Sequence, residues 1–171
     1  MDQFRQTARL GRNHKIALEL WGRMDESLAA SASKRFLDAI WSGDPPSTIE
    51  LTEQLDRLLV CYHDLKGTDT AYPEQGPPER DWRAVYDQAG KRFPDYGLYP
   101  TAIPADGFSG AMGAGDAIDD ITDITLEMRE VIWYAENYGA AAADTCFRDS
   151  YYHWGQHARE LLVFLHGKEF G

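Results

Sequence analysis

The feature that most constrains the fold is the regular spacing of apolar residues in two long stretches of the chain. In Asp144–His166 the intervals between them are 4, 3, 4, 3 and 4, and the residues are Phe147, Tyr151, Trp154, Ala158, Leu161 and Leu165. In Asp116–Tyr138 the same intervals separate Ala117, Ile121, Ile124, Met128, Val131 and Ala135. This period puts each set on one face of an α-helix. We therefore expect two amphipathic helices that form a hairpin through a short connection near Gly139, the second ending before Gly167.

Three further helical regions precede these two. Ser47-Thr48-Ile49-Glu50 is a capping box, which predicts a helix that starts here and ends by Gly67. Glu79–Arg92 predicts a shorter helix with one apolar side. Residues 14–41 carry an interrupted apolar pattern and predict two helices or one bent helix, whereas residues 1–12 are a short helix or a frayed end.

The region Phe93–Gly115 lacks any regular pattern. It holds three prolines, five glycines and several aromatic residues, which predicts a long irregular loop packed on the helices. No stretch of the chain predicts a β-strand. The expected fold class is therefore all-α, with residues 1–171 forming a single domain. Its architecture would be an irregular antiparallel bundle of about five helices with this long loop.

Composition excludes several classes of partner. The chain has 28 acidic and 17 basic residues and a formal charge of −11, which argues against binding to nucleic acid or to an anionic membrane. No apolar run approaches the roughly 20 residues of a membrane span. The charged first residues lack the apolar core of a signal peptide, so the expected location is the cytoplasm. Two cysteines, Cys61 and Cys146, predict buried thiols and not a disulfide framework.

Acidic residues recur along one side of the helix predicted from Asp116. They are Asp116, Asp120, Asp123, Glu127 and Glu130, at intervals of 4, 3, 4 and 3, and we call them the carboxylate ridge. An acidic face in contact with solvent is the first interpretation. Clustered carboxylates also suit a hard cation such as Mg²⁺ or Mn²⁺, and a basic partner surface is a third possibility.

Two histidines lie beside the apolar stripe of the last helix. His153 and His157 are one turn apart, so that they point the same way and could share one metal ion. The alternative is that each imidazole only forms a hydrogen bond to a backbone carbonyl or to the acidic helix. Two histidines are too few for a zinc site. A hypothetical metal site would therefore combine His153 and His157 with Asp120, Asp123 and Glu127 of the neighbouring helix.

Two motifs in these helices resemble a known family. They are Asp119-Asp120-Ile121-Thr122-Asp123-Ile124 and His153-Trp154-Gly155-Gln156-His157, the latter with Phe147 before it. With these motifs, the chain from about Ile49 to His166 resembles the bacterial domain-of-unknown-function family 5063. The resemblance implies a small, all-helical cytoplasmic protein, and it implies no activity.

The sequence contains no recognisable catalytic triad, phosphate-binding loop or complete metal-ligand set. It therefore favours a non-enzymatic protein-interaction or regulatory module whose partner is another, unidentified protein, without a cofactor. The alternative is a divalent-metal-dependent hydrolase that acts on a phosphoester or a nucleotide.

Two structural expectations accompany this interpretation. Eight residues should form the core: Leu55, Leu58, Leu59, Ile121, Met128, Phe147, Trp154 and Leu161. His153 and His157 should face the carboxylates of Asp116–Glu130, because a semi-buried imidazole needs a polar partner. A separation of more than about 8 Å between the imidazole nitrogens and every one of these carboxylates would exclude both a direct contact and a shared metal ion.

Overall fold

The computed structural model describes residues 27–65, 73, 75–102 and 112–171. Within them it has six helices, α2 (Leu28–Trp41), α3 (Thr48–Asp64), α4 (Trp82–Arg92), α5 (Ala117–Tyr138), α6 (Ala140–Asp149) and α7 (Tyr151–Phe170), and two strands, β1 (Leu98–Thr101) and β2 (Gly113–Asp116). The predominantly helical fold predicted from the sequence is thus confirmed. Among the described residues, no helix combines the length and apolarity needed to cross a membrane. The expected helix from residue 14, the end at residues 1–12 and Gly67 lie outside the described residues.

Side-chain caps fix where most of these helices begin. The predicted capping box of α3 is confirmed, since Ser47 and Glu50 each accept a hydrogen bond from the other's backbone N–H. Asp116 caps α5. Asp81 caps α4, which therefore begins at Trp82 and not at Glu79 as the sequence suggested. A capping oxygen satisfies one of the free N–H groups of the first turn, so each start follows from local chemistry.

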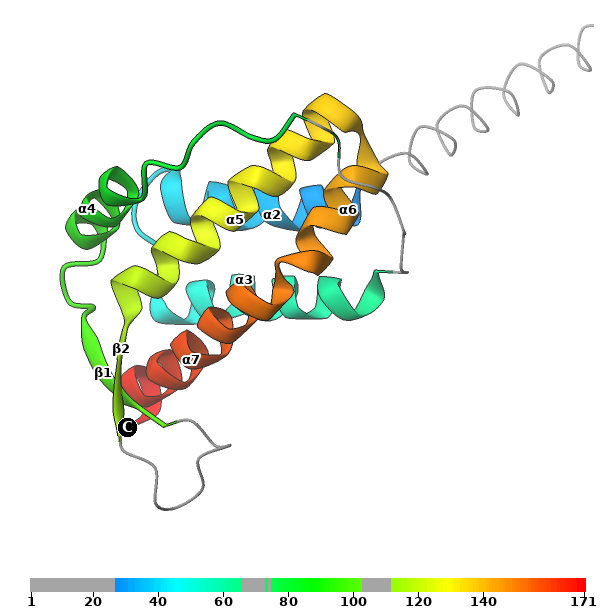
Figure 1. Cartoon of the computed structure of the whole chain (residues 1–171). Helices are drawn as coiled ribbons and strands as arrows, with labels where there is room; N and C mark the ends of the chain where they lie inside the picture. Colours follow the sequence, from blue (N-terminus) through cyan, green and yellow to red (C-terminus); the bar gives the residue numbers. More distant parts are fainter. Residues whose placement is uncertain (1–26, 66–72, 74, 103–111) are drawn as a thin grey trace, which may run out of the picture.

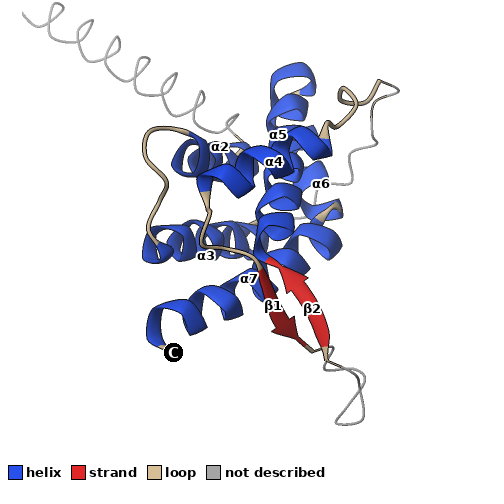
Figure 2. Cartoon of the chain, turned by 90° about the vertical axis from the view of Figure 1, so that its left-hand side faces the viewer, coloured by secondary structure: helices blue, strands red, loops and turns tan. Residues whose placement is uncertain are grey.

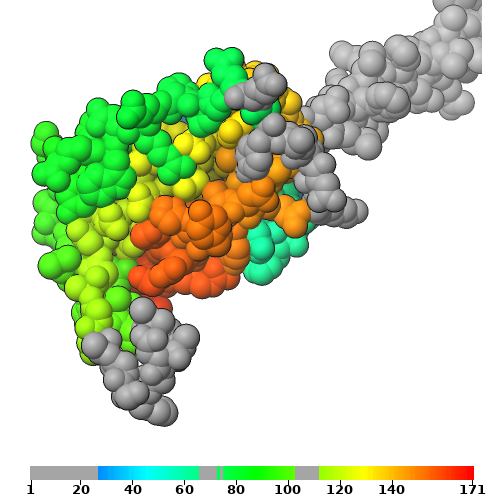
Figure 3. All heavy atoms as spheres, in the orientation of Figure 1, coloured from blue at the N-terminus to red at the C-terminus, as the bar shows by residue number. Residues whose placement is uncertain are grey.

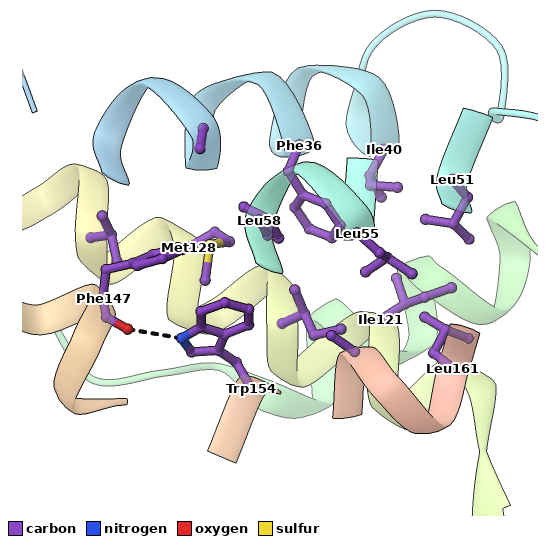
Figure 4. Packing of buried hydrophobic residues seen from close by; sticks show 14 of the residues in the cluster. Phe36, Ile40, Leu51, Leu55, Leu58, Ile121, Met128, Phe147, Trp154 and Leu161 are labelled. Atoms are coloured by element: carbon purple, nitrogen blue, oxygen red, sulfur yellow. Dashed lines mark hydrogen bonds between the residues drawn. The ribbon is translucent and has the colours of Figure 1, made fainter. Parts of the chain in front are cut away.

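Helix α5 is the central element of the fold. It contacts α2, α4, α6 and α7, while α3 packs against α2 and α7 (Figure 1). Seven of the eight predicted core residues are buried, and Leu59 is half-buried against the same cluster. Figure 4 shows Phe36 and Leu58 from the first helix pair meeting Met128 of α5 and Trp154 of α7. This one apolar cluster therefore fixes the position of α7 relative to α5.

The helix predicted over Asp144–His166 is in fact two helices that meet at Ser150. The indole N–H of Trp154 donates to the backbone carbonyl of Phe147 at 2.9 Å (Figure 4). In a continuous helix that carbonyl would accept the N–H of Tyr151. The Ser150 hydroxyl also bonds back to the carbonyl of Cys146. Side chains thus compete for the backbone at this point, which no apolar spacing reveals.

The C-terminal end of α7 also differs from the prediction. The helix continues through Gly167 to Phe170, and the backbone N–H of Gly171 still bonds the carbonyl of Gly167. This additional turn contains mostly exposed side chains, so it extends the helix without adding to the core.

The region predicted to be an irregular loop contains an antiparallel pair of strands, which corrects the expectation of no β-structure. β1 pairs with β2 (Figure 2), and in this pairing Tyr99 lies opposite Gly115. A Cβ atom on Gly115 would lie 2.4 Å from the Tyr99 ring, so only glycine lets this ring rest against the neighbouring strand. The glycine and proline content concealed strands of only four residues each, because such residues are depleted in strands in general.

Candidate metal centre

The carboxylate ridge does not face solvent as the first interpretation held. Asp120 and Glu127 are 2 % and 5 % exposed, and Asp123 is partly buried. Their side of α5 is covered by α7 and by the segment before α4. Figure 3 shows α5 in yellow and α7 in orange and red side by side on one face of the molecule. Because these carboxylates are removed from water, they need hydrogen-bond or charge partners within the protein.

The two histidines of α7 supply part of that need. His157 Nδ1 lies 2.7 Å from Asp120 Oδ1, and His153 Nδ1 lies 3.2 Å from Glu127 Oε1. These distances confirm the expectation that both imidazoles face the carboxylates of α5. The packing of Trp154, Ala158 and Leu161 in the core brings this about, because histidines beside that stripe must then face the helix next to it.

The remaining ring nitrogens converge on a single oxygen atom. His157 Nε2 lies 3.3 Å from Asp123 Oδ2, and His153 Nε2 lies 3.9 Å from the same oxygen. The two rings are 4.8 Å apart and nearly perpendicular. Each histidine therefore turns its Nδ1 to a carboxylate behind it and its Nε2 to Asp123.

Three residues outside the predicted set hold the carboxylates from behind. The Trp82 indole N–H donates to Asp123 Oδ1 at 2.9 Å, which leaves Oδ2 to the histidines. The Tyr99 hydroxyl donates to Asp120 Oδ2 at 2.5 Å. Arg80 reaches Glu127 at 3.0 Å and Glu130 at 2.5 Å. The orientation of the central groups is thus fixed by a second layer of hydrogen bonds.

Sequence reasoning missed these three supporting residues. Trp82 fitted the apolar side of a helix, Tyr99 lay in the presumed loop, and nothing in the spacing singles out Arg80. All three come from elements that reach α5 only through the tertiary fold. The one available signal was the excess of acid on α5, which requires a cation from elsewhere in the chain.

Ionisation in the cluster follows from burial and neighbouring charge. Burial on its own would lower the pKa of His157, but the hydrogen bond to Asp120 and the charges of Asp120, Asp123 and Asp119 outweigh it, and the pKa is raised. Burial raises the pKa of Asp120 in spite of its hydrogen bonds from His157 and Tyr99. Both shifts have the same meaning, which is that the Asp120–His157 pair retains a proton.

The donor set and its spacing fit a divalent metal ion. One ligand atom from each of Asp123, His153 and His157 lies within 4.8 Å of the other two. Two ligands of one metal lie about 3–3.6 Å apart when each bond is about 2.1 Å long, so a small movement of His153 would complete the geometry. Asp119, Asp120 and His157 form a second such group. The first fits better, because both imidazoles take part and each has its other nitrogen held.

The five residues of the hypothetical site thus fall into two roles. Asp123, His153 and His157 converge and could bind the ion, whereas Asp120 and Glu127 orient the two imidazoles. In protein metal sites, the other ring nitrogen of a ligating histidine usually donates a hydrogen bond to such a carboxylate. The side chains of His153, His157 and Asp123 are 38 %, 20 % and 15 % exposed, so the centre lies near the surface.

Comparison with models of known families, with curated proteins and with solved structures gave no match. The resemblance to the domain-of-unknown-function family 5063 accordingly stays a prediction.

Proposed function

We propose that the protein binds one divalent transition-metal ion through Asp123, His153 and His157 and uses it for hydrolysis. The observation that carries this proposal is that the Nε2 atoms of both histidines converge on Asp123 Oδ2. The other polar atoms of these three side chains, both Nδ1 atoms and Asp123 Oδ1, are each held by a partner. Neutral imidazole and carboxylate are suitable ligands for zinc, iron and manganese.

Three protein ligands support a catalytic role over a structural one. Structural zinc sites use four protein ligands, whereas catalytic sites keep a position for water or substrate. Such an ion lowers the pKa of its bound water toward neutrality and so supplies a nucleophile. In this chain Asp120 and Glu127 would keep the imidazoles in the tautomer that presents Nε2, and Trp82 would aim Asp123.

Charge around the centre restricts the substrate. Asp119, Asp120, Glu127 and Glu130 surround the proposed ligands, and Arg80 is the cation that pairs with two of them. Substrates with several phosphates, such as nucleotides, would be repelled. A phosphoester with a single charge, or a neutral ester or amide, is the better match.

Metal analysis of the purified protein tests the proposal. After growth with added zinc or manganese and long dialysis, we expect close to one ion per chain by mass spectrometry. The double variant His153→Gln/His157→Gln should retain none. His63→Gln is the matched control, because His63 is an exposed histidine on α3, away from the centre.

Two further readouts make the result decisive. Zinc or manganese should raise the melting temperature of the wild type and of the control, but not of the double variant. Binding should release protons to the solvent, because the Asp120–His157 pair must lose its extra proton before His157 can bind the ion through Nε2. If no ion is retained and none of Mg²⁺, Mn²⁺, Fe²⁺ and Zn²⁺ shifts the melting temperature, the metal centre is refuted. The protein-interaction module favoured by the sequence would then be the better hypothesis.

A further inference from the structure

A cavity of about 720 Å³ lies between β1 and α7, separate from the candidate metal centre. Asp123, His153 and His157 do not line it. Its apolar and aromatic walls come from Tyr99 and Pro100 on one side and from Tyr151, Tyr152 and Val163 on the other. Tyr152 and Val163 are 82 % and 73 % exposed, so large apolar side chains face this space uncovered by the described residues. Its size is within the range of small-molecule pockets, roughly 300–1,000 Å³.

The same wall carries two opposite charges at adjacent positions. The guanidinium of Arg159 lies over the Tyr151 ring, 5.2 Å from its centroid, and bonds the Tyr151 hydroxyl and the carbonyl of Gly155. Three of its five N–H donors have no partner among these bonds. Glu160 accepts a hydrogen bond from Gln156 at 3.0 Å.

Neither charge is neutralised within the part of the chain that the structure describes. No carboxylate lies within ion-pair distance of Arg159 there, and no cation lies within that distance of Glu160. The stacking of Arg159 on Tyr151 also holds the guanidinium ready for a carboxylate, which it can bind by two parallel hydrogen bonds.

From this arrangement we infer that the cavity binds a small aromatic zwitterion of the amino-acid class. The ligand's carboxylate pairs with Arg159, its ammonium group with Glu160, and its ring packs among the tyrosines. Aromatic side chains favour such stacked or edge-on ring contacts. Tyr99 also holds Asp120 behind the metal centre, but none of the proposed metal ligands lines the pocket, so the two proposals can fail separately.

Three probes that differ by one charged group test the inference. They are L-phenylalanine, 3-phenylpropionate, which lacks the ammonium group, and phenethylamine, which lacks the carboxylate. Binding is followed by chemical-shift changes in the NMR spectrum of the full chain with a chelator present, so that no metal ion binds the probe. We expect L-phenylalanine to bind about tenfold more tightly than either analogue, a difference of 1.4 kcal/mol.

Charge variants show which residue recognises which group. Arg159→Gln should weaken L-phenylalanine and 3-phenylpropionate about tenfold and leave phenethylamine unchanged. Glu160→Gln should weaken L-phenylalanine and phenethylamine and leave 3-phenylpropionate unchanged. Arg83→Gln is the matched control, because Arg83 also lies over a tyrosine ring, that of Tyr86, but does not line the cavity.

Clear outcomes would overturn the inference. Absence of any shift with all three probes at millimolar concentration would do so. Equal affinity for L-phenylalanine and 3-phenylpropionate would do so as well, since the ammonium group would then have no site. Val163→Trp should fill the mouth of the cavity and abolish binding of every probe, while the far-ultraviolet dichroism stays that of the wild type. Undiminished binding to this variant would show that the probes bind elsewhere.

Discussion

Removal of the Trp154 side chain should weaken the fold more than most single substitutions. Trp154 is fully buried, and it contacts the rings of Phe147, Tyr62 and Tyr151. Trp154→Ala removes this contact area and leaves a cavity in the cluster that joins α3, α5 and α7. The usual loss for a large core aromatic is about 3–5 kcal/mol. At about 2–4 °C per kcal/mol for a chain of this size, the melting temperature should fall by about 6–20 °C.

The hydrogen bond of the indole adds a second, separable part. Trp154→Phe keeps much of the ring but removes the N–H that bonds the carbonyl of Phe147. A buried carbonyl left without a partner costs about 1–3 kcal/mol. Alternatively the N–H of Tyr151 takes over the carbonyl, and α6 and α7 become more continuous. The first outcome lowers stability at unchanged helix content, whereas the second raises helix content and lowers stability little.

Urea denaturation followed by circular dichroism measures both variants. Trp133→Ala is a suitable control, because Trp133 is a half-buried tryptophan of α5 that contacts Tyr134 and Tyr138 at the edge of the fold. It should lose clearly less stability than Trp154→Ala. A loss of unfolding free energy below about 1 kcal/mol for Trp154→Ala would refute the central position given to this side chain, because removal of a fully buried tryptophan should lower stability by more than that.

Three further predictions concern the site and the thiols. Gly115→Ala should displace the Tyr99 ring, since the new Cβ would lie 2.4 Å from it, and so break the hydrogen bond from Tyr99 to Asp120. A changed Tyr99 signal in NMR and weaker metal binding would show this, and a metal affinity equal to that of the wild type would contradict it. In the metal-free protein the raised pKa of His157 should make the free energy of unfolding fall as the pH rises from about 6.5 through the folded pKa, because the stabilisation from a raised pKa is fully present only below the unfolded pKa. Urea curves with a chelator should show a flatter pH dependence for His157→Gln than for His63→Gln, and equal slopes would refute the pairing. Cys146 is buried as the sequence predicted, whereas Cys61 is only partly buried. Desolvation still raises the pKa of Cys146 to about 12 and that of Cys61 to about 11, so neither thiol should react quickly with iodoacetamide at pH 8 until the chain is unfolded. Rapid alkylation of the native protein would contradict these raised pKa values.

Local signals in the sequence were sufficient for most of the helices. The capping box at Ser47 predicted the start of α3 correctly, because a cap acts on backbone groups only two or three residues away, and the helix predicted from Asp116 does begin there as α5. The apolar stripe likewise identified Phe147, Trp154 and Leu161 as core residues. These features depend on neighbours in the chain, and a single sequence contains all of them.

The errors concern bonds between distant residues or between side chain and backbone. The bend at Ser150 depends on one indole that takes a carbonyl seven residues before it, which the spacing of apolar residues cannot express. The strand pair depends on Tyr99 and Gly115 lying opposite each other across a connection of more than ten residues. For the centre, the sequence suggested His153 and His157 with Asp120, Asp123 and Glu127, but it could not assign which carboxylate would converge and which would support.

The burial of the ridge explains why a cation is expected where the three groups converge. Arg80 balances Glu127 and Glu130, and a protonated His157 balances Asp120. Asp123 accepts a hydrogen bond from the neutral indole N–H of Trp82, and its other oxygen lies near the Nε2 atoms of both imidazoles, which it shares with Asp120 and Glu127. Asp123 is partly buried and has no cation of its own, which is costly, so near neutral pH the cluster has to retain protons or bind a metal ion. The two states compete for the same histidines, because ligation requires neutral imidazoles and a proton makes His157 a cation. Metal affinity should therefore rise with pH over the range in which the stability of the metal-free protein falls. One titration that follows both quantities can relate the ionisation of His157 to metal binding.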